Sequence, residues 1–288
     1  MEYWLGAALV PVEDLCEVAR AAERAGFTGV AVPDHIVVPG KRETAYPYSD
    51  EPFPDEMPFY DCLSAVSAMA AVTSTLRFVS WVYVLSMRNA ALAARQIATV
   101  SDLTGGRLTL GVGVGWLREE FEVLGFGFAD RGRRTDEMLD FLGQIWRTGT
   151  AEYRGQSLRV PPVRVLPPPR YVPRVWSGGH SDAAISRAAR HDGWIGLILS
   201  REETKHHLER LESARQRGGH AASASFARVM SPAEPPTREL FDDLEGLGVT
   251  GVVVFPGTMS VPYGAPRQDR IGQINSFGES YIDGGRPR

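Results

Sequence analysis

The sequence predicts an α/β protein of the (β/α)8 TIM barrel class, with insertions after strands 2, 3 and 4. Short apolar runs alternate along the chain with segments whose apolar residues recur at helical spacing. Eight such strand–helix alternations can be counted, most connections are short, and the length of 288 residues suits one barrel. We therefore expect residues 1–288 to form a single TIM-barrel domain.

The first βαβ unit is the clearest. An apolar strand at 3–9 is followed by a helix at 12–25, a stop at Gly26 and a second apolar strand at 29–33. The remaining strands are expected at 76–84, 107–113, 173–177, 193–199, 224–230 and 250–255. The remaining helices are expected at 60–73, 89–103, 132–147, 181–190, 202–217 and 236–247, with a last one at 267–283.

Two segments interrupt this alternation. The stretch 34–59 is too long for a simple connection and is rich in proline and aromatic residues, so we expect it to act as a lid. The stretch 149–172 contains the turn 154–156 and predicts a hairpin insertion.

Composition restricts the partners. The formal net charge is −4, which leaves no basic footprint for a nucleic acid or an anionic membrane. No apolar run reaches the roughly 18 residues of a membrane span, and no signal peptide precedes the first strand. Cys16 and Cys62 are expected to be buried free thiols, and a cytoplasmic location follows.

The carboxyl ends of barrel strands carry the active site, and Asp34 and His35 follow the second strand. An acid–His pair at this place predicts a proton-handling site. The structural alternative is that Asp34 caps a turn and His35 bonds a backbone carbonyl. A metal-dependent hydrolase would need further ligands at other strand ends, and 197–199, 229–230 and 254–255 offer none, so no metal is expected.

Glycine recurs at every second position where the fourth strand ends, at Gly111, Gly113 and Gly115. Glycine weakens a strand unless something approaches its backbone closely, and we expect a flat cofactor to do so. The alternative is that these glycines only let helices pack closely. The spacing G-x-G-x-G after a fourth strand does not match a Rossmann fingerprint.

The fifth strand runs through Gly178, Gly179 and His180 into an alanine-rich helix. Backbone amides at such a helix start favour a phosphate, and the alternative is a plain turn with Ser181 as the helix N-cap. Asn89 is expected mainly to cap the helix after the third strand. At least two of the residues Arg131, Arg133 and Arg134 are expected to be solvated or ion-paired, and the alternative is contact with a phosphate or an acidic cofactor tail.

The ordered motifs from Leu15 to Trp194 resemble the bacterial-luciferase-like, flavin- or deazaflavin-dependent oxidoreductases, and the fit is closest to the coenzyme F420-dependent branch. The most specific motifs are Arg88-Asn89, Gln96 to Thr99, Leu103 to Arg107, Gly111 to Trp116, Glu119 to Phe121, Arg131 to Arg134 and the Gly178-Gly179 turn.

This resemblance implies roles for individual residues. His35 would be the catalytic proton donor or acceptor beside the deazaflavin, with Asp34 orienting or tuning it. Trp81-Val82 matches the place of a non-proline cis peptide behind the ring. The other implied cofactor contacts are Asn89, Gly113, Gly115, Gly178, Gly179 and His180.

Two tryptophans depart from the family pattern. Trp81 replaces a small residue at the bulge that the family forms behind the ring. Trp116 replaces the glutamate of the sugar-phosphate dehydrogenases of the F420 branch, which also hold the sugar phosphate with lysines, and here Lys205 is the single candidate outside the lid. Trp81 and Trp116 therefore predict an apolar or aromatic substrate pocket.

The resulting expectation is hydride transfer between F420 and a small organic substrate. The alternatives are an FMN-dependent luciferase-like monooxygenase and a non-catalytic family member that has lost its cofactor. Relatives are often dimers, so by analogy we expect this chain to form a homodimer.

Overall fold

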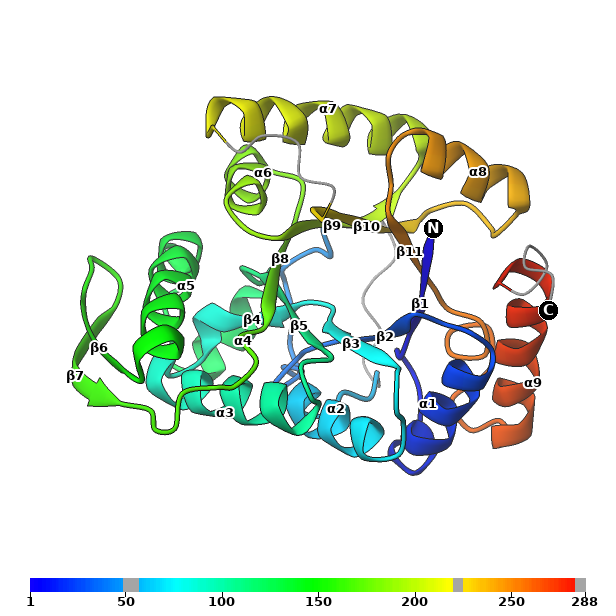
Figure 1. The fold of residues 1–288 in the computed structure, drawn as a ribbon, viewed down its shortest axis with the longest axis horizontal. Coiled ribbons are helices and arrows are strands. Elements are labelled where there is room, and N and C mark those ends of the chain that lie inside the picture. The colour runs from blue at the N-terminus through cyan, green and yellow to red at the C-terminus, as the bar shows by residue number, and fades with distance from the viewer. Residues whose placement is uncertain (49–56, 220–224, 283–288) are drawn as a thin grey trace.

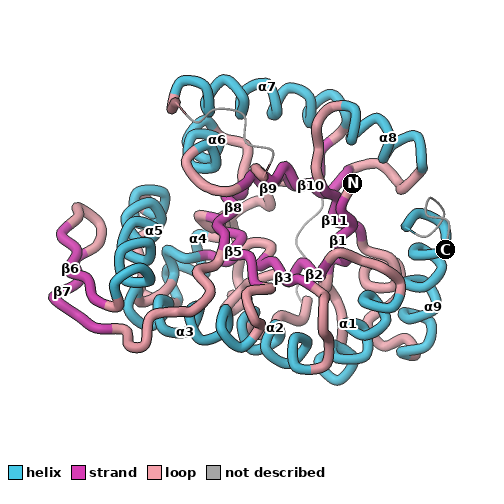
Figure 2. Tube along the Cα trace, in the orientation of Figure 1, coloured by secondary structure: helices cyan, strands magenta, loops and turns pink. Residues whose placement is uncertain are grey.

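The computed structural model describes residues 1–48, 57–219 and 225–282. Within them, eight parallel strand positions close into a barrel, because β3 pairs with both β2 and β5 and β1 pairs with β11 (Figures 1 and 2). These strands are β1 (Glu2–Gly6), β2 (Gly29–Val32), β3 (Arg77–Ser80), β5 (Leu108–Gly113), β8 (Arg174–Gly178), β9 (Gly193–Leu199), β10 (Ala227–Pro232) and β11 (Gly251–Val254). The predicted (β/α)8 class is confirmed.

Helices surround this ring of strands (Figure 2). Those that follow the barrel strands are α1 (Leu15–Arg24), α2 (Cys62–Ala71), α3 (Ala90–Leu103), α5 (Arg131–Thr148), α6 (Asp182–Ala189), α7 (Arg201–Arg217), α8 (Arg238–Gly246) and α9 (Arg267–Phe277). Short turns of helix lie at Val12–Asp14, Leu85–Met87 and Gly278–Ile282. Side-chain caps start several helices as the sequence suggests; for example, Ser200 and Glu203 form a capping box on α7.

The core has two layers. Side chains that point into the barrel form one cluster, which includes Trp4, Trp176 and Val229. A larger cluster fills the space between the strands and the helices. Strands such as β2 and β5 are buried along their whole length because both faces are covered, which explains their continuous apolar sequences.

The third strand position differs from the prediction of one strand over 76–84. It is divided into β3 and the short β4 (Tyr83–Val84), and the peptide bond between Trp81 and Val82 at the break is cis. The insertion after this strand is short, since residues 81–89 hold only β4 and one helical turn. The insertion after strand 4 adds α4 (Arg118–Val123).

The predicted hairpin is present as β6 (Thr150–Arg154) and β7 (Arg159–Arg164), which pair antiparallel and extend beside α5 (Figure 1). The carboxylate of Glu137 on α5 accepts hydrogen bonds from the backbone N–H groups of Gln156 and Ser157, each at 2.9 Å, and so fixes the hairpin turn.

Two further expectations can be compared with the structure. Cys62 is buried and Cys16 is half-buried, and neither forms a disulfide. No helix in the described parts of the chain is long and apolar enough to cross a membrane.

Candidate active site

A cavity of about 870 Å³ opens at the carboxyl ends of the barrel strands. Its wall contains residues that follow every barrel strand, for example Ala8, His35, Trp81, Gly115, Gly179, Leu197, Ser231 and Phe255. This is the catalytic face of a TIM barrel, and the volume falls in the range of small-molecule and cofactor sites. Ten of the predicted site residues line it: Asp34, His35, Trp81, Val82, Gly113, Gly115, Trp116, Gly178, Gly179 and His180.

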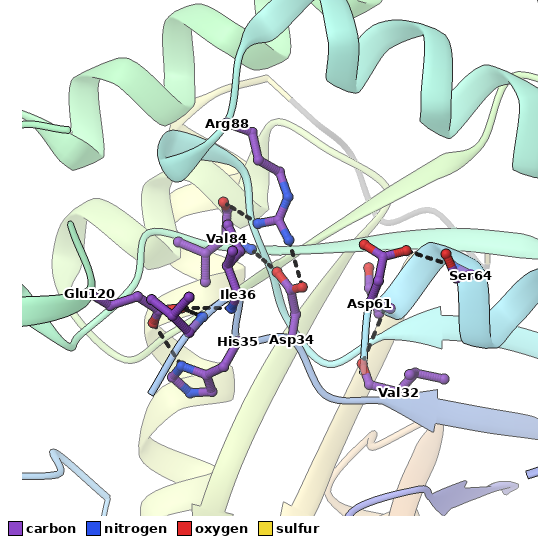
Figure 3. Close-up of polar contacts among 12 residues, drawn as sticks. Val32, Asp34, His35, Ile36, Asp61, Ser64, Val84, Arg88 and Glu120 are labelled. Carbon is purple, nitrogen blue, oxygen red and sulfur yellow. Dashed lines mark hydrogen bonds and ion pairs between the residues drawn. The ribbon is translucent and has the colours of Figure 1, made fainter. Parts of the chain in front are cut away.

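His35 lies on the cavity wall and is held by a carboxylate from α4 (Figure 3). Its Nδ1 lies 2.8 Å from Oε2 of Glu120, whose side chain is 1% exposed. The other oxygen of Glu120 accepts hydrogen bonds from the backbone N–H groups of Ile36 and Val37. Glu120 therefore meets the Nδ1 side of the imidazole and two backbone N–H groups at once, which fixes the orientation of His35 on the cavity wall.

Asp34 has a different partner, although it is the neighbour of His35. Its carboxylate accepts from Arg88 at 2.7 Å and from the backbone N–H of Val84 at 2.9 Å (Figure 3). Burial raises the pKa of Asp34, and the Arg88 guanidinium opposes that rise. The expectation that Asp34 orients His35 is therefore wrong. Asp34 instead ties the end of β2 to the segment after the cis peptide, and Glu120 orients His35.

The glycines of strand β5 make room for protein atoms. A Cβ on Gly111 would lie 2.0 Å from the carbonyl oxygen of Ser80, and one on Gly113 would lie 2.3 Å from Cγ2 of Val82. Val82 also packs against Gly178, where a Cβ would lie 3.1 Å from its Cγ1. The close approach at Gly111 and Gly113 is thus made by the segment 80–82. Gly113 also lies in the cavity wall, and its contact with a cofactor stays a prediction.

The turn after β8 leads into a helix that Ser181 caps, as predicted in the alternative interpretation, and phosphate binding there stays a prediction. Gly179 has φ +118°, a conformation that favours glycine, and Ser181 caps α6 by accepting from the N–H of Ala184. The N–H groups of Asp182 and Ala183 lie in the first turn of α6 and have no intrahelical acceptor.

His180 is fixed by contacts that the sequence does not reveal. Its Nε2 accepts a hydrogen bond from the N–H of Leu197 at 3.1 Å, and its ring stacks on His207 at 4.8 Å. Arg210 donates to the carbonyl oxygen of His180 and to Nδ1 of His207, each at 2.8 Å. Burial and the neighbouring His207 lower the pKa of His180 to about 4, so its imidazole is neutral at pH 7. His207 is half-buried in this stack.

Aromatic side chains line the outer part of the cavity. Tyr46 contacts both Trp116 and Tyr48 edge-on, at 5.1 and 5.5 Å between ring centroids. Phe59 contacts the ring of His35 at 4.7 Å. The described parts of the predicted lid segment, 34–48 and 57–59, thus contribute to the cavity wall, and 49–56 lie outside the described residues.

Asn89 caps α3 by accepting from the N–H of Leu92, which confirms the cap predicted for it; it is exposed and does not belong to the cavity wall. At least two of Arg131, Arg133 and Arg134 are predicted to be solvated or ion-paired, and only Arg133 is exposed. Arg134 donates to three backbone carbonyls, those of Ser86, Arg88 and Ser157, and Arg131 donates to those of Gly115 and Phe128.

Fold and site together define a (β/α)8 barrel protein with a cavity large enough for a flavin-type cofactor. The sequence profile described as luciferase-like monooxygenase matches residues 3–236. The chain belongs to this family, whose members are oxidoreductases and monooxygenases.

Three relatives illustrate the similarity. An uncharacterized protein of Mycobacterium tuberculosis is 33% identical over 271 residues, which cover 92% of this chain and 93% of that protein. The structure of the monooxygenase RslO1 from Streptomyces bottropensis has a TM-score of 0.79 at 18% identity and covers 98% of this chain and 99% of that one. An F420-dependent secondary alcohol dehydrogenase, solved with an F420–acetone adduct, has a TM-score of 0.75 at 14% identity, with 97% of both chains covered.

Two functional contacts are missing from the sequence-based prediction. Glu120 occurs in the quoted motif Glu119 to Phe121, and Arg88 occurs in Arg88-Asn89, but neither had a role assigned. The signal was a charged residue inside a family motif, and only the fold shows that Glu120 reaches His35 and Arg88 reaches Asp34.

Proposed function

We propose that this protein is a coenzyme F420-dependent oxidoreductase that transfers a hydride between the deazaflavin and a small apolar or aromatic substrate. The observation that carries the proposal is the His35–Glu120 pair, a proton carrier with a fixed orientation on the wall of a largely apolar cavity. The secondary alcohol dehydrogenase with the same fold supports F420 as the cofactor by analogy.

The residues of the cavity fit such a cofactor. The turn Gly178–Gly179 and the first N–H groups of α6 suit its phosphate, and Asp182 at that helix start is neutralised by Arg210 at 2.6 Å. Trp81, Val82 and Gly115 would face its ring system. When bound, the deazaflavin supplies the carbon that carries the hydride, which is chemistry that no amino-acid side chain provides.

The chain's own residues then handle the proton. Reduction of a carbonyl substrate takes up one proton at its oxygen, and oxidation of the alcohol releases one. His35 is the residue that gives or takes that proton in this proposal, since Glu120 holds its imidazole on the cavity wall. Phe59 and Trp116 contact this imidazole, Tyr46 packs against Trp116, and these rings favour an apolar substrate body.

The alternative is an FMN-dependent monooxygenase, the activity after which the family is named. F420 and FMN share a tricyclic ring and a phosphate, so both can use the same cavity.

Binding distinguishes the two cofactors. The purified protein is titrated with F420 by the fluorescence of the deazaflavin and, in parallel, with FMN. We expect saturable F420 binding in the micromolar range and weaker FMN binding. Micromolar FMN binding without F420 binding would overturn the F420 assignment.

A further inference from the structure

Two arginines meet on one aromatic ring at the rim of the cavity. The guanidinium carbon of Arg131 lies 3.8 Å from the centroid of the Phe128 ring, and that of Arg118 lies 4.5 Å from the same centroid. Phe128 and Arg131 both belong to the cavity wall. Arg131 is therefore held in the cavity wall, and Arg118, which is exposed, lies against the same ring.

No carboxylate compensates these charges within the described residues. Neither Arg118 nor Arg131 forms an ion pair there, and Asp130, next to Arg131 in sequence, forms none either. Burial and the proximity of Arg118 lower the pKa of Arg131, which is the direction expected when like charges approach each other.

The side-chain donors of the two arginines are only partly used. Arg131 donates from Nε to Gly115 and from Nη1 to Phe128, both backbone carbonyls at 3.0 Å, and its Nη2 has no acceptor in the described chain. Arg118 makes no hydrogen bond to any described residue; the Phe128 ring is its contact. The hydrogen bonds from Nε and Nη1 thus fix the guanidinium group of Arg131, and its Nη2 remains available to donate to a ligand.

Arg131 is the first residue of α5, and the start of this helix adds further positive charge. The first turn of α5 contains Arg131, Arg133 and Arg134 and no acidic residue, which is the reverse of the usual preference at the positive end of a helix dipole. Each nitrogen of the Arg134 guanidinium donates to a backbone carbonyl, but these neutral acceptors do not cancel its positive charge. An anion at this rim would relieve the repulsion that the arrangement creates.

We propose that Arg118 and Arg131 form a subsite for an anionic group, a carboxylate or phosphate, carried by the molecule that occupies the cavity. The subsite rests on the proposed function, since it assumes that the cavity binds a cofactor and a substrate. The anion comes either from the acidic tail of the cofactor or from the substrate, and both would be recognised by the same charge-assisted hydrogen bonds.

The test compares ligand pairs that differ in their anionic groups. F420 is titrated against its chromophore without the phosphate and glutamate tail, FMN against riboflavin, and, on protein with bound cofactor, benzoate against benzamide. Each titration uses the wild type, Arg118→Gln, Arg131→Gln and Arg131→Lys. Arg118→Gln is the cleanest variant because it removes no hydrogen bond to the described chain.

The control is Arg147→Gln at the other end of α5. Arg147 is exposed and forms no ion pair with a described residue, so this variant makes the same change in net charge away from the cavity. It is expected to leave all six affinities unchanged.

We expect Arg131→Gln to weaken binding of the anionic member of at least one pair by about tenfold, and its neutral counterpart not at all. Arg118→Gln should act in the same direction but more weakly, since Arg118 is exposed and its charge is screened by salt. A loss confined to F420 or FMN assigns the anion to the cofactor, and a loss confined to benzoate assigns it to the substrate.

Equal affinities of the variants and the wild type for all anionic members would overturn the subsite. This outcome differs from failure of the proposed function, which shows as FMN binding without F420 binding in the wild type. In that case the FMN–riboflavin pair still decides on the subsite.

Discussion

Oε2 of Glu120 lies 2.8 Å from Nδ1 of His35, although the two residues are 85 positions apart in the chain. The preceding residue, Glu119, accepts hydrogen bonds from the backbone N–H groups of Glu43 and Thr44. Two consecutive carboxylates of α4 therefore hold both ends of the segment 36–44, and one of them also sets the orientation of the candidate proton carrier.

Glu120→Gln should slow turnover by about 10-fold to 100-fold with little change in cofactor affinity, because an uncharged amide stabilises the imidazolium less. His35→Ala should cost about 10²-fold to 10⁴-fold, the range for loss of a general acid–base. The measurement is the pH dependence of turnover, which Glu120→Gln should shift. The control is Glu122→Gln, an exposed residue of the same helix. A Glu120→Gln enzyme with an unchanged rate and pH profile would refute the role of Glu120.

Arg88→Met should lower the free energy of unfolding by about 3–5 kcal/mol, since it leaves the charge of Asp34 buried without a partner. Combining it with Asp34→Asn should recover part of this loss. Arg190→Met breaks an exposed pair with Asp136 and should cost at most about 1 kcal/mol. Urea denaturation of the three variants measures this. Equal losses for Arg88→Met and Arg190→Met would contradict a buried ion pair.

Gly113→Ala should destabilise the protein by about 1–3 kcal/mol, because its Cβ would overlap Val82. Val82→Ala should relieve most of this loss, so the double variant should show a coupling energy of about 1 kcal/mol or more. Gly272→Ala, on the exposed side of α9 with open space around it, should be neutral or stabilising. Additive effects of Gly113→Ala and Val82→Ala would show that Val82 is not the reason for this glycine.

His180 should make the stability depend on pH. Its pKa is about 4 in the folded protein, below the 6.5 of an ordinary histidine, so the unfolded chain takes up a proton first as the pH falls. Stability is therefore complete above pH 6.5 and decreases as the pH falls toward about 4. Burial also lowers the pKa of His191 and His207, so His180→Gln should reduce this slope without abolishing it. Urea midpoints between pH 4 and pH 7 test this, and an unchanged slope in His180→Gln would count against it.

Much of the fold could be predicted from the sequence because most barrel strands are rich in apolar residues and several helices, such as α3 and α7, begin with a side-chain cap. The cis peptide at Trp81–Val82 was expected from the family resemblance and is present. The division of the third strand into β3 and β4 was not expected, since it depends on how each of them pairs with β5.

The site was predicted in part. His35, the Gly178–Gly179 turn and Trp116 were found because they follow strand ends. Asp34 was predicted to orient or tune His35 because the two residues are adjacent in the sequence. Neighbouring side chains in extended backbone, however, point in opposite directions. The glycines of β5 were assigned to a cofactor because a sequence cannot show which atoms approach a backbone, and here those atoms belong to Ser80 and Val82.

Anaerobic turnover tests the central claim most directly. Reduced F420 and reduced FMN are each mixed with the protein and a panel of small apolar and aromatic ketones and aldehydes under argon, and cofactor oxidation is followed by absorbance. Hydride transfer needs no oxygen, so the account predicts oxidation of reduced F420 under argon that is lost in His35→Ala. Oxidation of reduced FMN alone, coupled to substrate only after air is admitted, would contradict the account and identify a monooxygenase.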